Sequence, residues 1–310
     1  MAHGGGNRAI IAALSANLGI AVTKFIAYLL TGSSSMLAES VHSVADSGNQ
    51  ALLLLGGKRA RRAANSAHPF GFGRERFLYA FIVAIVLFSL GGLFALYEAW
   101  HKWSNPEPIE GQWWWVPLAV LGAAMVMEGF SFRTAVHESN LIRGRQGWVS
   151  FIRSAKAPEL PVVLLEDFGA LIGLVLAMFG VGLTLLTGDG RFDAAGTASI
   201  GVLLVAIAVV LAAETRSLLL GESATQENID AVEAALVGRG VLSVIHLRTL
   251  HIGPEELLVA AKIEVVGAQT AAEVAEAIDD AEARVRAAVP IATTIYLEPD
   301  LRHAVASTQG

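Results

Sequence analysis

Ionisable side chains inside long apolar stretches are the residues of this chain that could do chemistry. His42 and Asp46 are four residues apart, so a helix would place both on one face. Glu39 precedes His42 by three residues and falls on the same stripe. An imidazole and a carboxylate at this spacing can form half of a tetrahedral site for a divalent ion such as Zn²⁺. A hydrogen-bonded His–Asp pair between helices, or a proton acceptor, explains the same spacing.

A second acidic pair, Glu166 and Asp167, lies in the apolar run 160–170. Two adjacent carboxylates in such a run cannot both stay ionised without a counter-charge. A metal ion held by the His42 stretch would supply that charge. Adjacent residues differ by about 100° around a helix, so only one of the two can point squarely at a shared site. The pair therefore favours a metal site over a purely structural contact.

Three further charged residues lie in apolar stretches. Glu128 could relay protons or pair with a buried cation, and Lys24 is an available partner. A structural ion pair explains Glu128 at least as well as a functional role does. Glu98 lies near the end of its stretch, where a long side chain can reach the membrane interface, and we assign it no function.

The elements that must position these groups are membrane helices. Of the 310 residues, 54% are hydrophobic and only 16% are charged, which is more apolar than a soluble enzyme or a disordered chain. Six apolar stretches reach the roughly 17–25 residues that span a bilayer. They cover residues 9–31, 34–57, 77–100, 114–135, 159–186 and 195–215.

Cysteine and net charge exclude other classes. The chain has no cysteine, so disulfides, thiolate metal sites and cysteine nucleophiles are absent. A net charge of −6 argues against a nucleic-acid partner. Any metal chemistry must therefore use imidazole and carboxylate groups.

The composition changes after Leu220, where residues 219–310 hold 14 of the 28 acidic residues and 6 of the 22 basic ones. We expect a transmembrane domain over 1–220 and a small soluble domain over 221–310. The periodicity of the tail predicts an α+β fold of ferredoxin-like type. Its elements are a helix at 225–238, strands at 241–251 and 256–266, a helix at 269–288 and a strand at 292–298.

Basic residues predict the orientation in the membrane. They gather in the second and fourth connections between the apolar stretches, so these connections, both termini and the tail are expected in the cytoplasm. Trp100, Trp103 and the run 113–115 suit the outer interface. The segment Met1–Asn7 is too short and too polar for a cleaved signal peptide.

Several long strings resemble the cation diffusion facilitators. Residues 32–46 (GSSSMLAESVHSVAD) and 68–73 (HPFGFG) carry the family resemblance. Residues 46–50 (DSGNQ), 66–72 (SAHPFGF) and 164–167 (LLED) resemble the zinc-transporter-nine branch. The resemblance implies a homodimer that exports or redistributes divalent cations, usually Zn²⁺, in exchange for protons. The metal would be the transported substrate, and no cofactor is implied.

The resemblance also implies a transport site built from two residues four apart on the second span and two four apart on the fifth. His42 and Asp46 match the first pair, and Asp167 matches the last acid of the second. Val163 stands at the remaining position and cannot bind metal. We expect Glu166, Glu39 or water to complete the shell.

Two accessory sites of the family look degraded. In the loop after the second span His68 remains, but Asn65 and Phe72 stand where stronger ligands would be. In the tail the positions of a binuclear site read Ile245, Lys262 and Tyr296. We expect the tail to dimerise without metal, and we expect its other candidate ligands to be ordinary surface and strand residues. These are His246, His251 and Glu298.

The predicted function is a proton-coupled zinc transporter rather than an enzyme. A nitrogen ligand with carboxylates suits zinc, although Mn²⁺, Fe²⁺, Co²⁺ and Cd²⁺ remain alternatives. A membrane-embedded hydrolase lacks support because no His-Glu-x-x-His or Gly-x-Ser-x-Gly string occurs. A metal-binding sensor or scaffold that does not transport is the third hypothesis, and Val163 is the reason to consider it.

Overall fold

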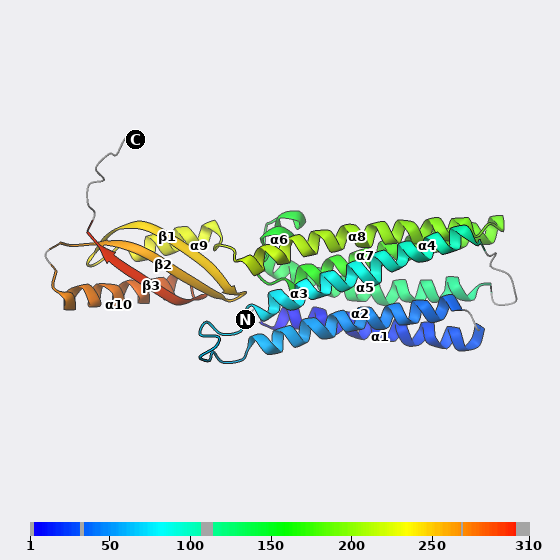
Figure 1. Cartoon of the computed structure of the whole chain (residues 1–310), viewed down its shortest axis with the longest axis horizontal. Coiled ribbons are helices and arrows are strands. Elements are labelled where there is room, and N and C mark those ends of the chain that lie inside the picture. The colour runs from blue at the N-terminus through cyan, green and yellow to red at the C-terminus, as the bar shows by residue number, and fades with distance from the viewer. Residues whose placement is uncertain (1–2, 32–33, 107–113, 268, 302–310) are drawn as a thin grey trace, which may run out of the picture. The chain divides into compact units, whose positions relative to one another are not determined.

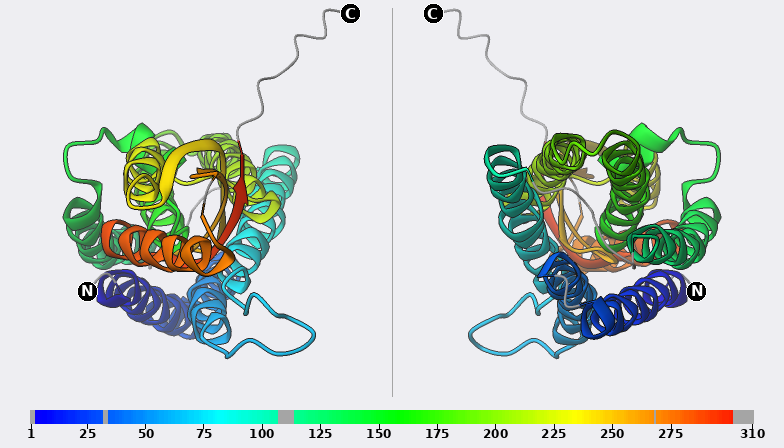
Figure 2. Two further views of the ribbon diagram at one scale, coloured as in Figure 1. Left: turned by 90° about the vertical axis from the view of Figure 1, so that its left-hand side faces the viewer. Right: turned by 90° about the vertical axis from the view of Figure 1, so that its right-hand side faces the viewer.

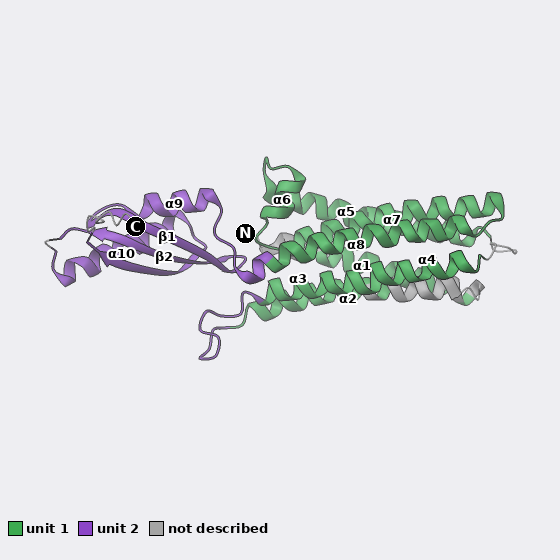
Figure 3. Ribbon diagram, turned by 45° about the horizontal axis from the view of Figure 1, so that its top comes forward, with its two compact units in different colours: residues 1–62, 75–216 green, residues 63–74, 217–310 purple. Residues whose placement is uncertain are grey.

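The computed structural model describes residues 3–31, 34–106, 114–267 and 269–301. The side chains of residues 3–9, 27, 28, 30, 31, 34–42 and 45 lie outside this description. The chain divides into two compact units, residues 1–62 with 75–216 and residues 63–74 with 217–310 (Figure 3). The second unit therefore holds the tail together with the connection that follows the second predicted span.

The described residues of the first unit form long helices that run along one another (Figure 1). Seen along their axes, α1 and α2 lie side by side (Figure 2). The third long helix runs without a break from α3 through a π-helical segment, η1, into α4. The bounds are α1 His3–Thr31, α2 Ser34–Ala60, α3 Glu75–Val86, η1 Leu87–Leu93, α4 Phe94–Ser104, α5 Val116–Arg143, α7 Glu159–Thr187 and α8 Arg191–Leu220.

Among the described residues, four of these long helices are apolar enough to cross a membrane. They are Glu75–Ser104, Val116–Arg143, Glu159–Thr187 and Arg191–Leu220. In α1 the apolar segment Ile10–Ile26 is shorter. The sequence of α2 is interrupted by polar residues, among them the candidate ligands Glu39, His42 and Asp46. The count of six spans therefore stays a prediction.

Large apolar side chains cover the outside of the first unit. Phe179 is 67% exposed and Leu186 is 85% exposed, which a bilayer explains and water does not. Between the helices, α7 and α8 approach closely at two glycines. A Cβ atom at Gly180 would lie 3.0 Å from the Phe192 carbonyl oxygen, and one at Gly196 would lie 3.1 Å from the Leu176 carbonyl oxygen.

The tail has the element order that its periodicity predicts, which confirms that part of the sequence analysis. The elements are α9 Gln226–Leu236, β1 Val241–Gly253, β2 Glu256–Val265, α10 Ala271–Ala288 and β3 Ala292–Asp300. Within the described residues the three strands form one sheet in the order β1-β2-β3, with β1 antiparallel and β3 parallel to β2. Side chains of β2 alternate between buried and half-buried, as a strand with one covered face requires.

Local signals explain where α10 begins. Thr270 is the N-cap, and its side chain and that of Glu273 form a reciprocal capping box. The two hydrogen bonds from the Thr270 backbone N–H and hydroxyl lower the pKa of the Glu273 carboxyl group. One short helix, α6 Trp148–Ser154, lies between α5 and α7 and was not predicted, because seven residues carry too little periodicity.

The close approach of α7 to α8 generates a stability prediction. We expect Gly180→Val to lower the free energy of unfolding by about 1–3 kcal/mol, because its side chain would overlap the α8 backbone. Gly182→Val is the matched control, since a Cβ atom there has nothing within 4 Å. Thermal unfolding in detergent measures both variants. Equal unfolding midpoints would contradict the close packing.

Candidate functional site

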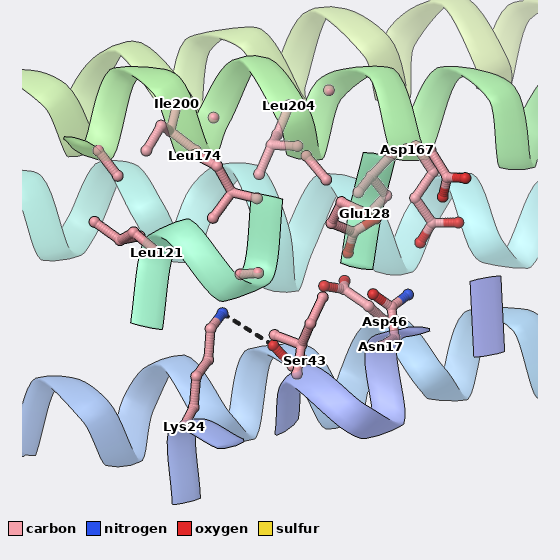
Figure 4. A pocket seen from close by; sticks show the side chains of 18 residues that line it. Asn17, Lys24, Ser43, Asp46, Leu121, Glu128, Asp167, Leu174, Ile200 and Leu204 are labelled. Carbon is pink, nitrogen blue, oxygen red and sulfur yellow. Dashed lines mark hydrogen bonds between the residues drawn. The ribbon is translucent and has the colours of Figure 1, made fainter. Parts of the chain in front are cut away.

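A cavity of about 130 Å³ lies between the helices of the first unit. Acidic side chains gather at one end of it, and Leu121, Leu174, Ile200 and Leu204 line the other end (Figure 4). Glycine and alanine residues of α7 leave the space open. The charged residues that line the cavity are Lys24, Asp46, Glu128, Glu166 and Asp167.

Asp46 reaches the cavity from α2, and Asp167 reaches it from α7. The structure thus brings together these two sequence-predicted residues around one space. Asp167 is 1% exposed, and its Oδ2 accepts a hydrogen bond from the Ser131 hydroxyl of α5 at 2.7 Å. The Ser131 hydroxyl therefore orients the Asp167 carboxyl group without placing a positive charge beside it.

Glu166 also lines the cavity, although it is adjacent to Asp167 on α7. Its Oε1 accepts a hydrogen bond from Asn49 Nδ2 at 2.9 Å, and its Oε2 accepts one from Gln50 Nε2 at 2.8 Å. Asn17 Nδ2 of α1 in turn donates to Gln50 Oε1 at 3.4 Å. Three helices are therefore joined by one buried polar network.

Lys24 and Glu128 share the cavity with these acids. Lys24 is 5% exposed, and its Nζ donates to Ser43 Oγ at 3.0 Å (Figure 4). Glu128 is 5% exposed and points toward the space that Asp46 also faces. The cavity therefore holds one buried ammonium group among the described acids, bonded to a hydroxyl of α2.

The remaining predicted ligands are Glu39 and His42, whose side chains lie outside the described residues. Among the described side chains, no three of the His, Cys, Asp or Glu type are close enough to share one metal ion. Val163 is fully buried in the apolar core of the first unit. The position one turn before Asp167 therefore faces apolar neighbours.

Sequence reasoning assigned no role to several residues that hold the acids in place. Asn49 and Gln50 are three and four residues after Asp46, so all three share one face of α2. This spacing was visible in the sequence, but the partner of each amide was not. The residues that reasoning missed are Asn17, Ser43, Asn49, Gln50 and Ser131.

The acid at the start of α7 has a different environment. Arg76 of α3 forms a two-point ion pair with Glu159, through Nε to Oε1 and through Nη2 to Oε2 at 2.9 Å. Glu159 is 5% exposed, so its burial is balanced by a full positive charge. This pair joins the start of α3 to the start of α7, and neither residue lines the cavity.

The accessory position His68 lies in an exposed loop and stacks on Phe72, with ring centroids 4.5 Å apart. The Asn65 side-chain oxygen accepts hydrogen bonds from the backbone N–H groups of Ala67 and His68 at 3.0 and 2.8 Å. Asn65 therefore shapes the turn. These contacts hold the loop in its conformation.

The tail positions that the resemblance suggested as a metal site carry other interactions. Lys262 Nζ forms ion pairs with Asp300 at 2.7 Å and with Glu298 at 3.3 Å, and these two carboxylates raise the pKa of Lys262. His251 is 1% exposed, and its Nδ1 lies 3.3 Å from the Gly253 carbonyl oxygen. His246 is exposed on β1.

Comparison with known proteins identifies the family. Residues 10–220 match the model of the cation efflux transmembrane domain. The chain is 30% identical over 247 residues to the mitochondrial proton-coupled zinc antiporter SLC30A9 of Xenopus laevis, covering 79% of this chain and 44% of that protein. It is 29% identical over 264 residues to metal tolerance protein C4 of Arabidopsis thaliana, covering 84% of this chain and 57% of that one.

A bacterial relative is matched over a larger share of its own length. The chain is 23% identical over 247 residues to zinc transporter ZitB of Pectobacterium atrosepticum, covering 80% of this chain and 70% of the relative. By contrast, the chain spans less than half the length of the SLC30A9 proteins that it matches. The family match and the four helices that are long and apolar enough to cross a membrane show a multi-pass integral membrane protein. The chain belongs to the cation efflux family, the cation diffusion facilitators, in the branch similar to zinc transporter nine.

Proposed function

We propose that this protein is a proton-coupled antiporter of divalent cations, with Zn²⁺ as its main substrate. The observation that carries the proposal is the buried cavity between membrane helices, lined by acids of α2, α5 and α7. Charged groups at such depth are costly and mark ion pathways. The names of the SLC30A9 relatives, which are proton-coupled zinc antiporters, support the same substrate and coupling.

The cation is held by His42, Asp46 and Asp167. An imidazole nitrogen with carboxylate oxygens suits zinc better than Mn²⁺, which prefers oxygen-only shells. Fe²⁺, Co²⁺ and Cd²⁺ are the alternative substrates. Glu166 supplies the further ligand in place of Val163, with Glu39 or water as the alternatives.

Proton coupling follows from competition at the same groups. A metal ligand must be deprotonated to bind, so cation binding releases protons and protonation releases the cation. Alternating access of one site to the two sides of the membrane then exchanges the cation for protons. Asp46, Asp167 and His42 carry the exchanged protons.

The remaining architecture is part of the proposal. Residues 1–220 form a transport domain of six spans, with both termini in the cytoplasm. Residues 221–310 form a ferredoxin-like domain through which two copies of the chain dimerise without metal. The basic residues of the second and fourth connections support the orientation.

A metal-binding scaffold or sensor is the second candidate, because Val163 removes a ligand from the family pattern. Tight zinc binding without flux would favour that function. A hydrolase has no comparable observation in its favour, and we propose no enzymatic activity.

Zinc flux in proteoliposomes under an imposed pH gradient tests the proposal. We expect Asp46→Ala and Asp167→Ala to reduce zinc flux by at least about tenfold, because each removes a carboxylate of the site. Asp189→Ala is the matched control, since Asp189 is exposed in the turn that precedes α8. Zinc flux at the wild-type rate in both site variants would show that the site is wrongly assigned.

The Ser131 hydroxyl allows a finer prediction. We expect Ser131→Ala to weaken zinc binding by about 10–100-fold, because Asp167 loses the group that orients it. Thr134→Ala on the same helix is the control, since its hydroxyl donates to the Phe130 carbonyl oxygen at 3.0 Å. Isothermal titration with Zn²⁺ measures both. A Ser131→Ala variant with unchanged affinity would remove Ser131 from the site.

A further inference from the structure

The carboxylate of Glu166 is held by a clasp of neutral amides, which we define as Asn17, Asn49 and Gln50. Asn49 Nδ2 and Gln50 Nε2 lie 2.9 and 2.8 Å from its two oxygens. Glu166 is 6% exposed, and the three amide residues are 0–4% exposed. Both oxygens of a buried carboxylate are thus fixed by donors from one helix.

The amide orientations follow from the network. Gln50 Oε1 accepts a hydrogen bond from Asn17 at 3.4 Å, so the nitrogen of Gln50 must face Glu166. Asn49 Nδ2 faces the other oxygen of the carboxylate, where an amide oxygen would be repelled. Asn49 and Gln50 therefore each donate a hydrogen bond to one oxygen of the Glu166 carboxylate.

Neutral donors have a different effect from a cation. Glu159, on the same helix α7, is paired with the Arg76 guanidinium group, which balances its charge. The clasp orients Glu166 and places no positive charge beside it. Hydrogen bonds that orient a metal-bound carboxylate in this way are a general feature of metal sites.

The Asn49 amide makes only part of its hydrogen bonds. Its Oδ1 is buried and has no hydrogen-bond partner among the described residues. A buried acceptor without a donor lowers stability. The hydrogen bond that the Asn49 nitrogen donates to Glu166 therefore explains the position of Asn49, since its side-chain oxygen gains no hydrogen bond there.

We propose that Asn49 and Gln50 are positioning residues that hold Glu166 at the cavity as the cation ligand missing at Val163. This inference rests on the proposed function. Val163 is fully buried among apolar side chains, and Glu166 lines the cavity one residue from Asp167. On this proposal the cation draws Glu166 and Asp167 together with Asp46, since the described side chains alone form no three-ligand group.

Isothermal titration of the purified full chain with Zn²⁺ tests the inference. We expect Glu166→Gln and the double variant Asn49→Ala/Gln50→Ala each to raise the Kd for zinc by about 10–100-fold. We expect all three substitutions together to bind zinc no more weakly than the double variant, because both changes remove the function of one carboxylate. Asn140→Ala/Gln146→Ala, which removes two exposed amides, should bind zinc as the wild type does.

Several results would overturn the inference. A Glu166→Gln variant with the wild-type Kd excludes Glu166 as a ligand. Additive losses in the combined variant show that the amides act other than through Glu166. A double variant that unfolds at a lower temperature but keeps the wild-type Kd shows a purely structural clasp. A wild-type protein that binds zinc but does not carry it overturns only the proposed transport, and the Kd pattern still decides the role of the amides.

Discussion

A carboxylate between apolar helices must have a partner, and this constraint organises the first unit. Leaving a charge unpaired in a medium of low dielectric constant costs more than packing can supply. Glu159 is balanced by Arg76, and Asp193 is balanced by Lys102, whose Nζ lies 3.0 Å away. Both of these ion pairs lie at ends of helices. Asp167 and Glu166, at the cavity, are held by a hydroxyl and by amides.

The difference in partners separates the acids at helix ends from the acids at the cavity. A guanidinium or ammonium partner at a helix end balances the charge of its carboxylate. A hydroxyl or amide partner orients the carboxylate but leaves its charge to be balanced by a metal ion or a proton. Lys24 is the exception inside the cavity, where it donates to Ser43 and lowers the net negative charge of the lining. The described lining thus contains four acidic groups and one ammonium group.

Small residues make room for this arrangement. Gly169 and Gly173 of α7 line the cavity, and a Cβ atom at Gly169 would lie 2.5 Å from Ile207 Cδ1. Further along the same helices, Gly180 and Gly196 let α7 and α8 approach at backbone distance. Ile200 and Leu204 of α8 line the apolar end of the same cavity. The shape of the cavity thus depends on glycines, and its acidic lining comes from α2, α5 and α7.

The sequence by itself determined the membrane class, the element order of the tail and the prominence of Asp46, Glu166 and Asp167. These features depend on composition, on the alternation of β2 and on helical spacing, which are local properties. Only the tertiary structure decided that Glu166 meets Asn49 and Gln50, that Asp167 meets Ser131 and that Glu159 meets Arg76. Each of these contacts joins residues far apart in the chain. Helical periodicity shows which face a polar residue occupies, but its partner depends on how the helices pack against one another.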